Sequence, residues 1–287
     1  MSKAASLRGF PALQAERAVK AALEEDLGLA GDITTQATVC ENTRAEAAIV
    51  ARAPGRIAGL QCAEAAFGMC DRSVKYENVI ADGADAAPGQ TLAHVSGPAA
   101  GILTGERVAL NFLCHLSGIA TATRAFANAV EGTQAHICCT RKTTPGLRAL
   151  EKYAVRAGGG QNHRFGLFDA VLIKDNHIAA AGGIETAVKR VRAHAGHMIQ
   201  VEVEVDTLEQ LGEVLSLDVD AVLLDNMSLG DLTEAVRRAN GKVLTEASGG
   251  VNLENVREIA ETGVDLISVG SLTHSPKALD LGLDFLS

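Results

Sequence analysis

The second half of the chain alternates short apolar runs with amphipathic segments. The runs are rich in β-branched residues and predict strands at residues 136–140, 170–173, 201–205, 221–224, 243–244 and 266–269. Between them, apolar residues recur at helical spacing, as at Leu208, Leu211 and Leu215. Strand–helix repeats with short polar joints predict parallel βα units. Six strands at this spacing favour a barrel of the (β/α)₈ kind with a missing or irregular strand, and a doubly wound open sheet is the alternative.

The first half has a different pattern. Residues 12–27 predict a helix that ends at Gly28, and residues 104–130 predict one long, mostly apolar helix that joins the halves. Two strand-like segments, residues 45–60 and 79–95, are interrupted by the turn pairs Pro54-Gly55, Asp82-Gly83 and Pro88-Gly89. We therefore expect a smaller α+β domain before the barrel, with a boundary near residue 110.

Composition narrows the class of protein. The 287 residues are 47% hydrophobic and 21% charged, which excludes a disordered or collagen-like chain. A net charge of −9 argues against a general nucleic-acid binder, because phosphate backbones need a basic face. The long uncharged stretches are broken by prolines or are too short for a membrane span, and the first ten residues lack an apolar signal core. The six cysteines include no C-x-x-C pair, so we expect reduced thiols. Together with the interrupted uncharged stretches, this predicts a cytoplasmic location and no membrane partner.

Each of the six predicted strands ends in a polar or charged residue. In a parallel barrel the functional side chains project from the carboxyl ends of the strands. A buried charge is costly unless it is paired, so a ring of such residues predicts a functional site rather than a plain core. The ring consists of Arg141, Lys142, Lys174, Glu204, Asp225, Glu246 and Ser268.

Positive charge is concentrated between Arg141 and His177. Seven basic and three acidic residues give this segment a net charge of +4 in an acidic chain. Such a basic pocket predicts a small polyanionic ligand, and arginine pairs bind planar carboxylates through two hydrogen bonds. A solvated helix face is the simpler interpretation for Arg148, Lys152 and Arg156.

Two glycine loops suggest a phosphate site. Ser248-Gly249-Gly250 follows a predicted strand and precedes a helix expected to begin at Asn252, and Val269-Gly270-Ser271 follows the next strand. Glycine lets backbone N–H groups approach an anion, and the last two loops of this barrel fold often bind phosphate. Neither a dinucleotide-binding nor a P-loop fingerprint is present in the sequence.

Carboxylates face this basic segment. Glu202 and Glu204 are two residues apart on one predicted strand and point the same way, and Asp225 ends the next strand. Oxygen ligands of this kind suit Mg²⁺ bound partly through substrate phosphates. Simple charge compensation of the arginines and lysines is the alternative. We interpret His194 and His197 as surface residues, since no third metal ligand lies near them in the sequence.

Five motifs carry a family likeness. They are residues 140–148 (TRKTTPGLR), 158–164 (GGGQNHR), 174–177 (KDNH), 105–112 (GERVALNF) and 116–121 (LSGIAT). Together they resemble the quinolinate phosphoribosyltransferase family (nicotinate-nucleotide pyrophosphorylase, carboxylating) over nearly the whole chain. The resemblance implies a type II phosphoribosyltransferase fold: an N-terminal α+β sandwich-like domain (residues 1–110), then an incomplete (β/α) TIM-like barrel (residues 111–274), with residues 275–287 returning to the first domain.

The resemblance also implies a reaction. Phosphoribose would pass from phosphoribosyl pyrophosphate to the pyridine nitrogen of quinolinate, with loss of one carboxylate. The products would be nicotinate mononucleotide, pyrophosphate and CO₂, a step of de novo NAD biosynthesis that requires Mg²⁺.

The same resemblance assigns roles to residues. Arg141, His163, Arg164 and Lys174 would hold the quinolinate carboxylates, with Thr140 also binding substrate. Lys142, Glu204 and Asp225 are the implied catalytic residues: Lys142 at substrate or pyrophosphate, Glu204 and Asp225 at the ribose and at Mg²⁺. The loops Ser248–Gly250 and Val269–Ser271 would bind phosphate. Arg107 would reach the neighbouring subunit's site, which implies a homodimer.

Three other functions compete with this one. A related pyrophosphorylase-like enzyme could share the fold and use another acceptor. A Schiff-base aldolase could use Lys174 as its nucleophile. A barrel without turnover could bind phosphorylated metabolites as a sensor. The residues 174–177 and the complete ring of cations and carboxylates favour quinolinate transfer.

Overall fold

The computed structural model describes residue 7 and residues 9–286, which fall into two compact units. Within the described chain, unit 1 takes the residues up to 124, residues 143–159 and the residues from 272 on, and unit 2 takes residues 125–142 and 160–271. Helix α4 (Ala99–Ala129) runs through the predicted domain boundary near residue 110. That boundary stays a prediction.

Unit 2 is built on a parallel sheet with the strand order β6-β11-β10-β9-β8-β7. Its strands are β6 (His136–Cys138), β7 (Val171–Ile173), β8 (Val201–Val205), β9 (Ala221–Asp225), β10 (Leu244–Ser248) and β11 (Leu266–Ser268). Consecutive strands are neighbours from β7 to β11, and β6 joins at β11 rather than at β7. The sheet therefore winds in one direction, as an incomplete barrel does, and the doubly wound alternative is wrong.

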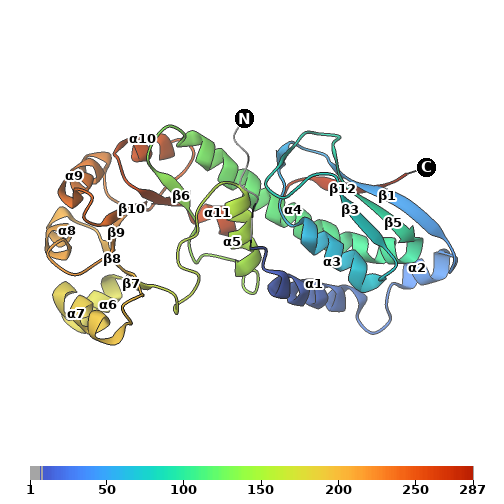
Figure 1. The fold of residues 1–287 in the computed structure, drawn as a ribbon, viewed down its shortest axis with the longest axis horizontal. Helices are drawn as coiled ribbons and strands as arrows, with labels where there is room; N and C mark the ends of the chain where they lie inside the picture. The colour runs from blue at the N-terminus through green and yellow to red at the C-terminus, as the bar shows by residue number, and fades with distance from the viewer. Residues whose placement is uncertain (1–6, 8, 287) are drawn as a thin grey trace. The chain divides into compact units, whose positions relative to one another are not determined.

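The helices of unit 2 lie on the outer side of the arc that the strands form (Figure 1). They are α6 (Asp175–Ala181), α7 (Ile184–His194), α8 (Leu208–Val214), α9 (Leu229–Ala239) and α10 (Val256–Glu261). The short α11 (Ser271–His274) begins at the last residue of unit 2, and its other residues belong to unit 1. Local chemistry sets several boundaries. Thr207 and Gln210 form a capping box at α8, Ser228 caps α9, and Asn240 ends α9 in the left-handed conformation.

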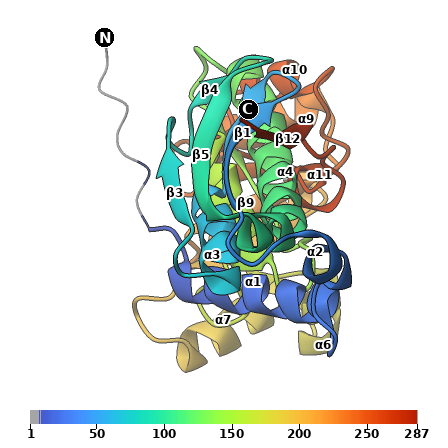
Figure 2. The same ribbon diagram turned by 90° about the vertical axis from the view of Figure 1, so that its right-hand side faces the viewer.

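Unit 1 contains a four-stranded sheet with the order β12-β1-β5-β3, and Figure 2 shows β3, β5 and β1 side by side. The strands are β1 (Arg44–Ala51), β3 (Lys75–Asn78), β5 (Thr91–Pro98) and β12 (Leu281–Phe285), all paired antiparallel; a separate ladder joins β2 (Gly55–Arg56) to β4 (Asp85–Ala86). An N-terminal α+β unit and an incomplete parallel barrel confirm the predicted fold class.

The helices of unit 1 match the sequence pattern only in part. Helix α1 (Ala12–Leu27) ends at Gly28 as predicted, and α2 (Ile33–Thr38) is capped by Asp32. Helix α3 (Leu60–Cys70) was not predicted. Gly59 takes a left-handed backbone (φ 101°), and the Asp82 carboxylate accepts the N–H groups of Gly59 and Leu60, so the cap comes from a residue distant in sequence.

Helix α5 (Arg148–Ala157) corrects the interpretation of Lys152 as a solvated residue. The Lys152 side chain is fully buried, while Arg148 and Arg156 are half-buried. Its neighbour Glu151 is also fully buried, accepting hydrogen bonds from His115 Nε2 (2.9 Å) and from the Thr144 N–H (3.1 Å). Helix α5 packs inside unit 1. The exposure of its side chains therefore follows from this packing and not from the pattern of charges along the helix. No described helix combines the length and hydropathy that a membrane crossing needs.

Candidate active site

A cavity of about 470 Å³ opens at the carboxyl ends of the unit 2 strands. Nine of the predicted site residues line it: Thr140, Arg141, Lys142, His163, Arg164, Lys174, Glu204, Asp225 and Ser248. The other lining residues are Leu172, Leu223, Glu246 and Ser268. Parallel strands bring their carboxyl ends to one edge, and loops separated widely in sequence therefore meet in one place.

The remaining predicted residues do not line this cavity. Gly249 and Gly250 lie in the loop after β10, Val269 and Gly270 follow β11, and Ser271 begins α11. Arg107 is exposed on α4, in unit 1. Their parts in substrate binding stay predictions.

Lys174 and Glu204 form an ion pair in the cavity. Lys174 Nζ lies 2.6 Å from Glu204 Oε2, with the lysine side chain about half exposed and the glutamate mostly buried. Lys174 also stands at the N-cap of α6, where its backbone N–H donates to His177 Nδ1 at 3.0 Å. The backbone and the ammonium of Lys174 are thus both fixed at the edge of the cavity.

Two guanidinium groups share the cavity wall. Burial lowers the pKa of Arg164, and the positive charge of Arg141 lowers it further, while Glu202 opposes both effects. Arg164 Nη1 donates to the Ala170 carbonyl at 3.0 Å, which fixes one nitrogen of the guanidinium group. A partly buried pair of like charges favours an anionic ligand, and a planar carboxylate matches the guanidinium geometry.

His163 and Glu246, which line the cavity, form a largely buried cluster with Glu202. His163 Nε2 is 3.0 Å from Glu202 Oε2 and 3.7 Å from Glu246 Oε1. Burial raises the pKa of Glu246 to about 7; the charge of Glu202 adds to the rise, and the electrostatic interaction with His163 opposes it. The carboxyl group of Glu246 therefore holds a proton near neutral pH more readily than an exposed glutamate does.

Donor atoms of this cluster lie within 4.8 Å of one another, close enough for a metal ion. However, the Arg164 N–H donates to His163 Nδ1 at 2.7 Å, which leaves the ring proton on Nε2. A protonated Nε2 has no lone pair for a metal, and instead donates to Glu202. The geometry fits a proton-holding cluster better than a metal site.

Glu204 and Asp225 are the carboxylates that fit a divalent cation. Both line the cavity, one oxygen of Glu204 contacts Lys174, and one oxygen of Asp225 accepts from the Asn226 amide. Each carboxylate keeps a second oxygen, and hard oxygen donors of this sort suit Mg²⁺ completed by phosphate and water. The residues present are therefore compatible with the ion that the sequence led us to expect.

The glycine loops differ from the expected helix-terminus geometry. Gly249 and Gly250 both have positive φ, but the following helix α10 begins at Val256 and not at Asn252. Asn252 Oδ1 instead accepts the N–H groups of Glu254 and Asn255, forming a polar turn that delays the helix. After β11, Val269 is buried and its N–H already donates to the Cys138 carbonyl at 2.9 Å.

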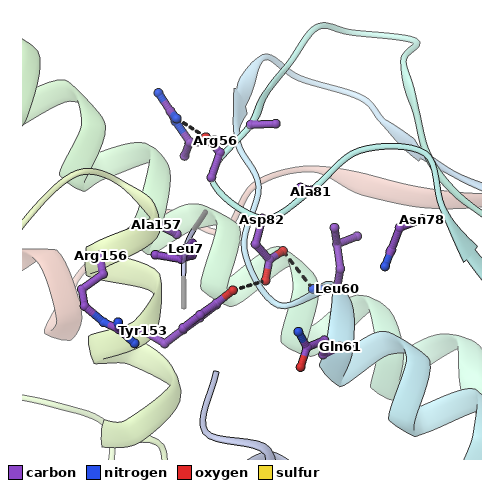
Figure 3. A pocket seen from close by; sticks show the side chains of 12 residues that line it. Leu7, Arg56, Leu60, Gln61, Asn78, Ala81, Asp82, Tyr153, Arg156 and Ala157 are labelled. Atoms are coloured by element: carbon purple, nitrogen blue, oxygen red, sulfur yellow. Dashed lines mark hydrogen bonds between the residues drawn. The ribbon is translucent and has the colours of Figure 1, made fainter. Parts of the chain in front are cut away.

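A second cavity, of about 550 Å³, lies within unit 1 (Figure 3). Its central carboxylate belongs to Asp82, which accepts from the Tyr153 hydroxyl at 2.8 Å and caps α3 as described above. Burial raises the pKa of Asp82, and these hydrogen bonds oppose the rise. Arg56 and Arg156 also line this cavity, but Asp82 is the one carboxylate among its described lining residues. Because that carboxylate already holds α3 and α5, the cavity offers fewer groups for a ligand than the unit 2 site does.

Glu246 and Ser268 belong to the predicted ring of polar strand ends and line the cavity, although the sequence assigned neither of them a role. Nothing in the sequence distinguished Asn226, whose amide contacts Asp225. Asn226 is distinguished by its left-handed backbone (φ 53°). The sequence does not reveal this feature, because positive φ at a residue other than glycine has no sequence marker.

The chain is similar to known proteins over nearly its whole length. Models of the N-terminal and C-terminal domains of quinolinate phosphoribosyl transferase match residues 32–117 and 119–284. A nicotinate-nucleotide pyrophosphorylase [carboxylating] of Mycobacterium leprae is 50% identical, over 93% of this chain and 95% of that protein. A mitochondrial quinolinate phosphoribosyltransferase [decarboxylating] of Nicotiana tabacum is 45% identical, covering 95% of this chain and 82% of that one. The crystal structure of NadC from Streptococcus pyogenes superposes with a TM-score of 0.93 at 40% identity, covering 98% and 100% of the two chains.

Proposed function

The chain belongs to the quinolinate phosphoribosyl transferase family and is a phosphoribosyltransferase of de novo NAD synthesis, and we propose that the unit 2 cavity is where it joins quinolinate to phosphoribosyl pyrophosphate. The products are nicotinate mononucleotide, pyrophosphate and CO₂. The observation that carries this proposal is the meeting of Arg141, Arg164 and Lys174 with Glu204 and Asp225 around one cavity. The cations suit a dicarboxylate, and the carboxylates suit the ribose.

Charge is the main obstacle to this reaction. Two polyanions must come together, and each pair of like charges at 4 Å costs about 4 kcal/mol at an effective dielectric near 20. Arg141, Arg164 and Lys174 offset this repulsion by binding the quinolinate carboxylates. Lys142, exposed at the cavity rim, contacts the pyrophosphate side and stabilises the charge that grows on the leaving group.

The ribose carbon becomes positive as its bond to pyrophosphate breaks. Glu204 and Asp225, on adjacent strands, stabilise that charge electrostatically, so no covalent nucleophile is needed. The same carboxylates would hold Mg²⁺, mainly through phosphoribosyl pyrophosphate. The bound ion supplies neutralisation of the pyrophosphate charge. The phosphate group itself would lie at the loops after β10 and β11.

A homodimer completes the proposed arrangement. Arg107 is exposed on α4 and would extend into the site of the neighbouring subunit, adding a cation for the substrate carboxylates. We further propose a cytoplasmic location, whereas a tobacco relative is named mitochondrial.

Release of CO₂ and pyrophosphate tests the function. The purified protein is incubated with Mg²⁺, phosphoribosyl pyrophosphate and either quinolinate or nicotinate. We expect both products with quinolinate and neither with nicotinate. Turnover with nicotinate would contradict quinolinate as the specific acceptor. Binding of phosphoribosyl pyrophosphate without turnover of either compound would mean that the acceptor is a different molecule. A lysine adduct trapped by borohydride with a carbonyl substrate would favour the aldolase alternative.

A further inference from the structure

We propose that Asn226 is a positioning residue for the reaction: its side-chain amide holds the carboxylate of Asp225, and glycine at position 249 leaves room for it. The inference rests on the proposed function, because it takes Asp225 to be the carboxylate at the ribose and the ion. It adds a residue that lies outside the cavity lining and that no motif singled out.

Asn226 contacts both the Asp225 side chain and the end of the neighbouring strand β10. Asn226 Nδ2 donates to Asp225 Oδ2 at 2.6 Å, and the Asn226 backbone N–H donates to the Ser248 carbonyl at 2.9 Å. The residue is thus tied to the ends of both β9 and β10. One oxygen of Asp225 is held by the amide, which directs the other oxygen and limits rotation of the carboxylate.

The backbone of Asn226 is in the left-handed region (φ 53°), which is unfavourable for a residue with a side chain. Among the described residues, the one other non-glycine residue with positive φ is Asn240, and it has a local explanation because it caps the C-terminus of α9. Asn226 follows a strand and caps no helix. Strain of this kind without a local structural reason is typical of functional sites.

Gly249 fits around the Asn226 side chain. A Cβ added at position 249 would lie 2.1 Å from Asn226 Oδ1 and 2.6 Å from its Cγ, and Gly249 itself has a φ of +98°. At Gly250 an added Cβ would meet nothing within 4 Å. Gly249 therefore leaves room for Asn226, independently of any part that Gly250 has in binding phosphate. This is a steric reason for a glycine that the sequence explained only by anion binding.

A simpler account is that Asn226 only shapes the turn after β9. The two accounts differ in one respect: if Asn226 acts through Asp225, its removal has no further effect once the Asp225 carboxylate is gone. A double-mutant cycle measures that coupling directly.

The experiment measures the dissociation constant of phosphoribosyl pyrophosphate, in the presence of Mg²⁺, by calorimetry on the full chain. The variants are Asn226→Ala, Asp225→Asn and the double variant, with Asn240→Ala as a matched control for a left-handed asparagine outside the site. We expect Asn226→Ala to weaken binding about 10-fold or more in the parent and less than about twofold in the Asp225→Asn background. Asn240→Ala should bind as the parent does.

A second variant guards against misfolding. Asn226→Asp keeps a residue that tolerates the left-handed region but replaces the amide donor by a carboxylate, so it should lose affinity at least as strongly as Asn226→Ala while unfolding at the parent's midpoint. Equal losses from Asn226→Ala in both backgrounds, or full affinity of Asn226→Asp, would overturn the inference. Failure of the parent protein to bind phosphoribosyl pyrophosphate would instead count against the proposed function.

Discussion

Lys174 Nζ lies 2.6 Å from Glu204 Oε2, which joins the residue that follows β7 to the carboxyl end of β8. The cation proposed for quinolinate is thus held by a carboxylate proposed for the ribose. The two substrate subsites share an ion pair, so a change on one side affects the other. The ion pair also gives the lysine a fixed direction before any substrate binds.

Removal of the Lys174 ammonium should mainly weaken quinolinate binding. We expect Lys174→Met to raise the KM for quinolinate about 100-fold, because a carboxylate loses its charged partner in a partly buried site. Lys189 is the matched control, since its ammonium lies at the same 2.6 Å distance from Glu185 but on the exposed surface of α7. Lys189→Met should leave the KM unchanged. Steady-state kinetics decide the matter, and an unchanged KM in Lys174→Met would refute the assignment.

Lys142 should matter for turnover more than for binding. We expect Lys142→Ala to lower kcat about 100-fold at saturating concentrations of both substrates, because its charge stabilises the departing pyrophosphate. Lys242, which is exposed after α9, provides the control, and its alanine variant should keep the parent's rate. Full turnover of Lys142→Ala at saturation would remove Lys142 from the catalytic residues.

Burial of Glu246 predicts a pH dependence of stability. Its pKa is about 7 in the fold against an ordinary value of 4.5, so between these pH values the folded chain holds a proton that the unfolded chain has released. The free energy of unfolding therefore falls as pH rises through this window. Glu246→Gln should abolish the fall and gain up to about 3 kcal/mol over the parent by pH 8. Urea denaturation at about pH 5 and pH 8 measures this. The exposed Glu254→Gln serves as control, and a parallel pH profile in Glu246→Gln would contradict the prediction.

Gly158 should be required for packing in unit 1. A Cβ there would lie 2.5 Å from both the Ala120 carbonyl oxygen and Thr123 Cβ, on helix α4. We expect Gly158→Ala to lower the free energy of unfolding by about 1–3 kcal/mol. Gly212, within α8, has nothing within 4 Å of an added Cβ, and Gly212→Ala should be neutral or stabilising by up to about 1 kcal/mol. Equal denaturation midpoints for the two variants would show that the backbone yields at Gly158.

Subunit complementation tests the predicted homodimer. Arg107→Ala and Lys174→Ala subunits should each show little turnover alone at a quinolinate concentration near the parent's KM, since every site would lack one cation. Mixing and reassembling them should restore activity to a heterodimer, because one of its sites then contains neither substitution. Turnover of the mixture against each parent variant is the measurement. No recovery in a mixture that sedimentation shows to contain dimers would disprove a shared site.

Periodicity predicted the strands of unit 2 because apolar positions of these strands are buried, as the three central residues of Ala221–Asp225 illustrate. Its failures have specific causes. Helix α3 begins where it does because Asp82, more than twenty residues later, caps Gly59 and Leu60. Lys152 has the sequence signature of a solvated residue, yet it is buried inside unit 1. Both outcomes depend on residues that meet only after folding.

The sequence by itself determined the fold class, the ring of polar strand ends and the family, since these depend on local spacing and on motifs such as residues 140–148 and 174–177. Tertiary structure decided which side chains contact one another at the site. Lys174 pairs with Glu204, His163 pairs with Glu202, and Asn226 lies between Asp225 and Gly249. The physical reason is that a strand's pattern fixes which face a side chain takes. Its partner comes from another strand or loop, and the register and packing of the whole sheet bring the two together.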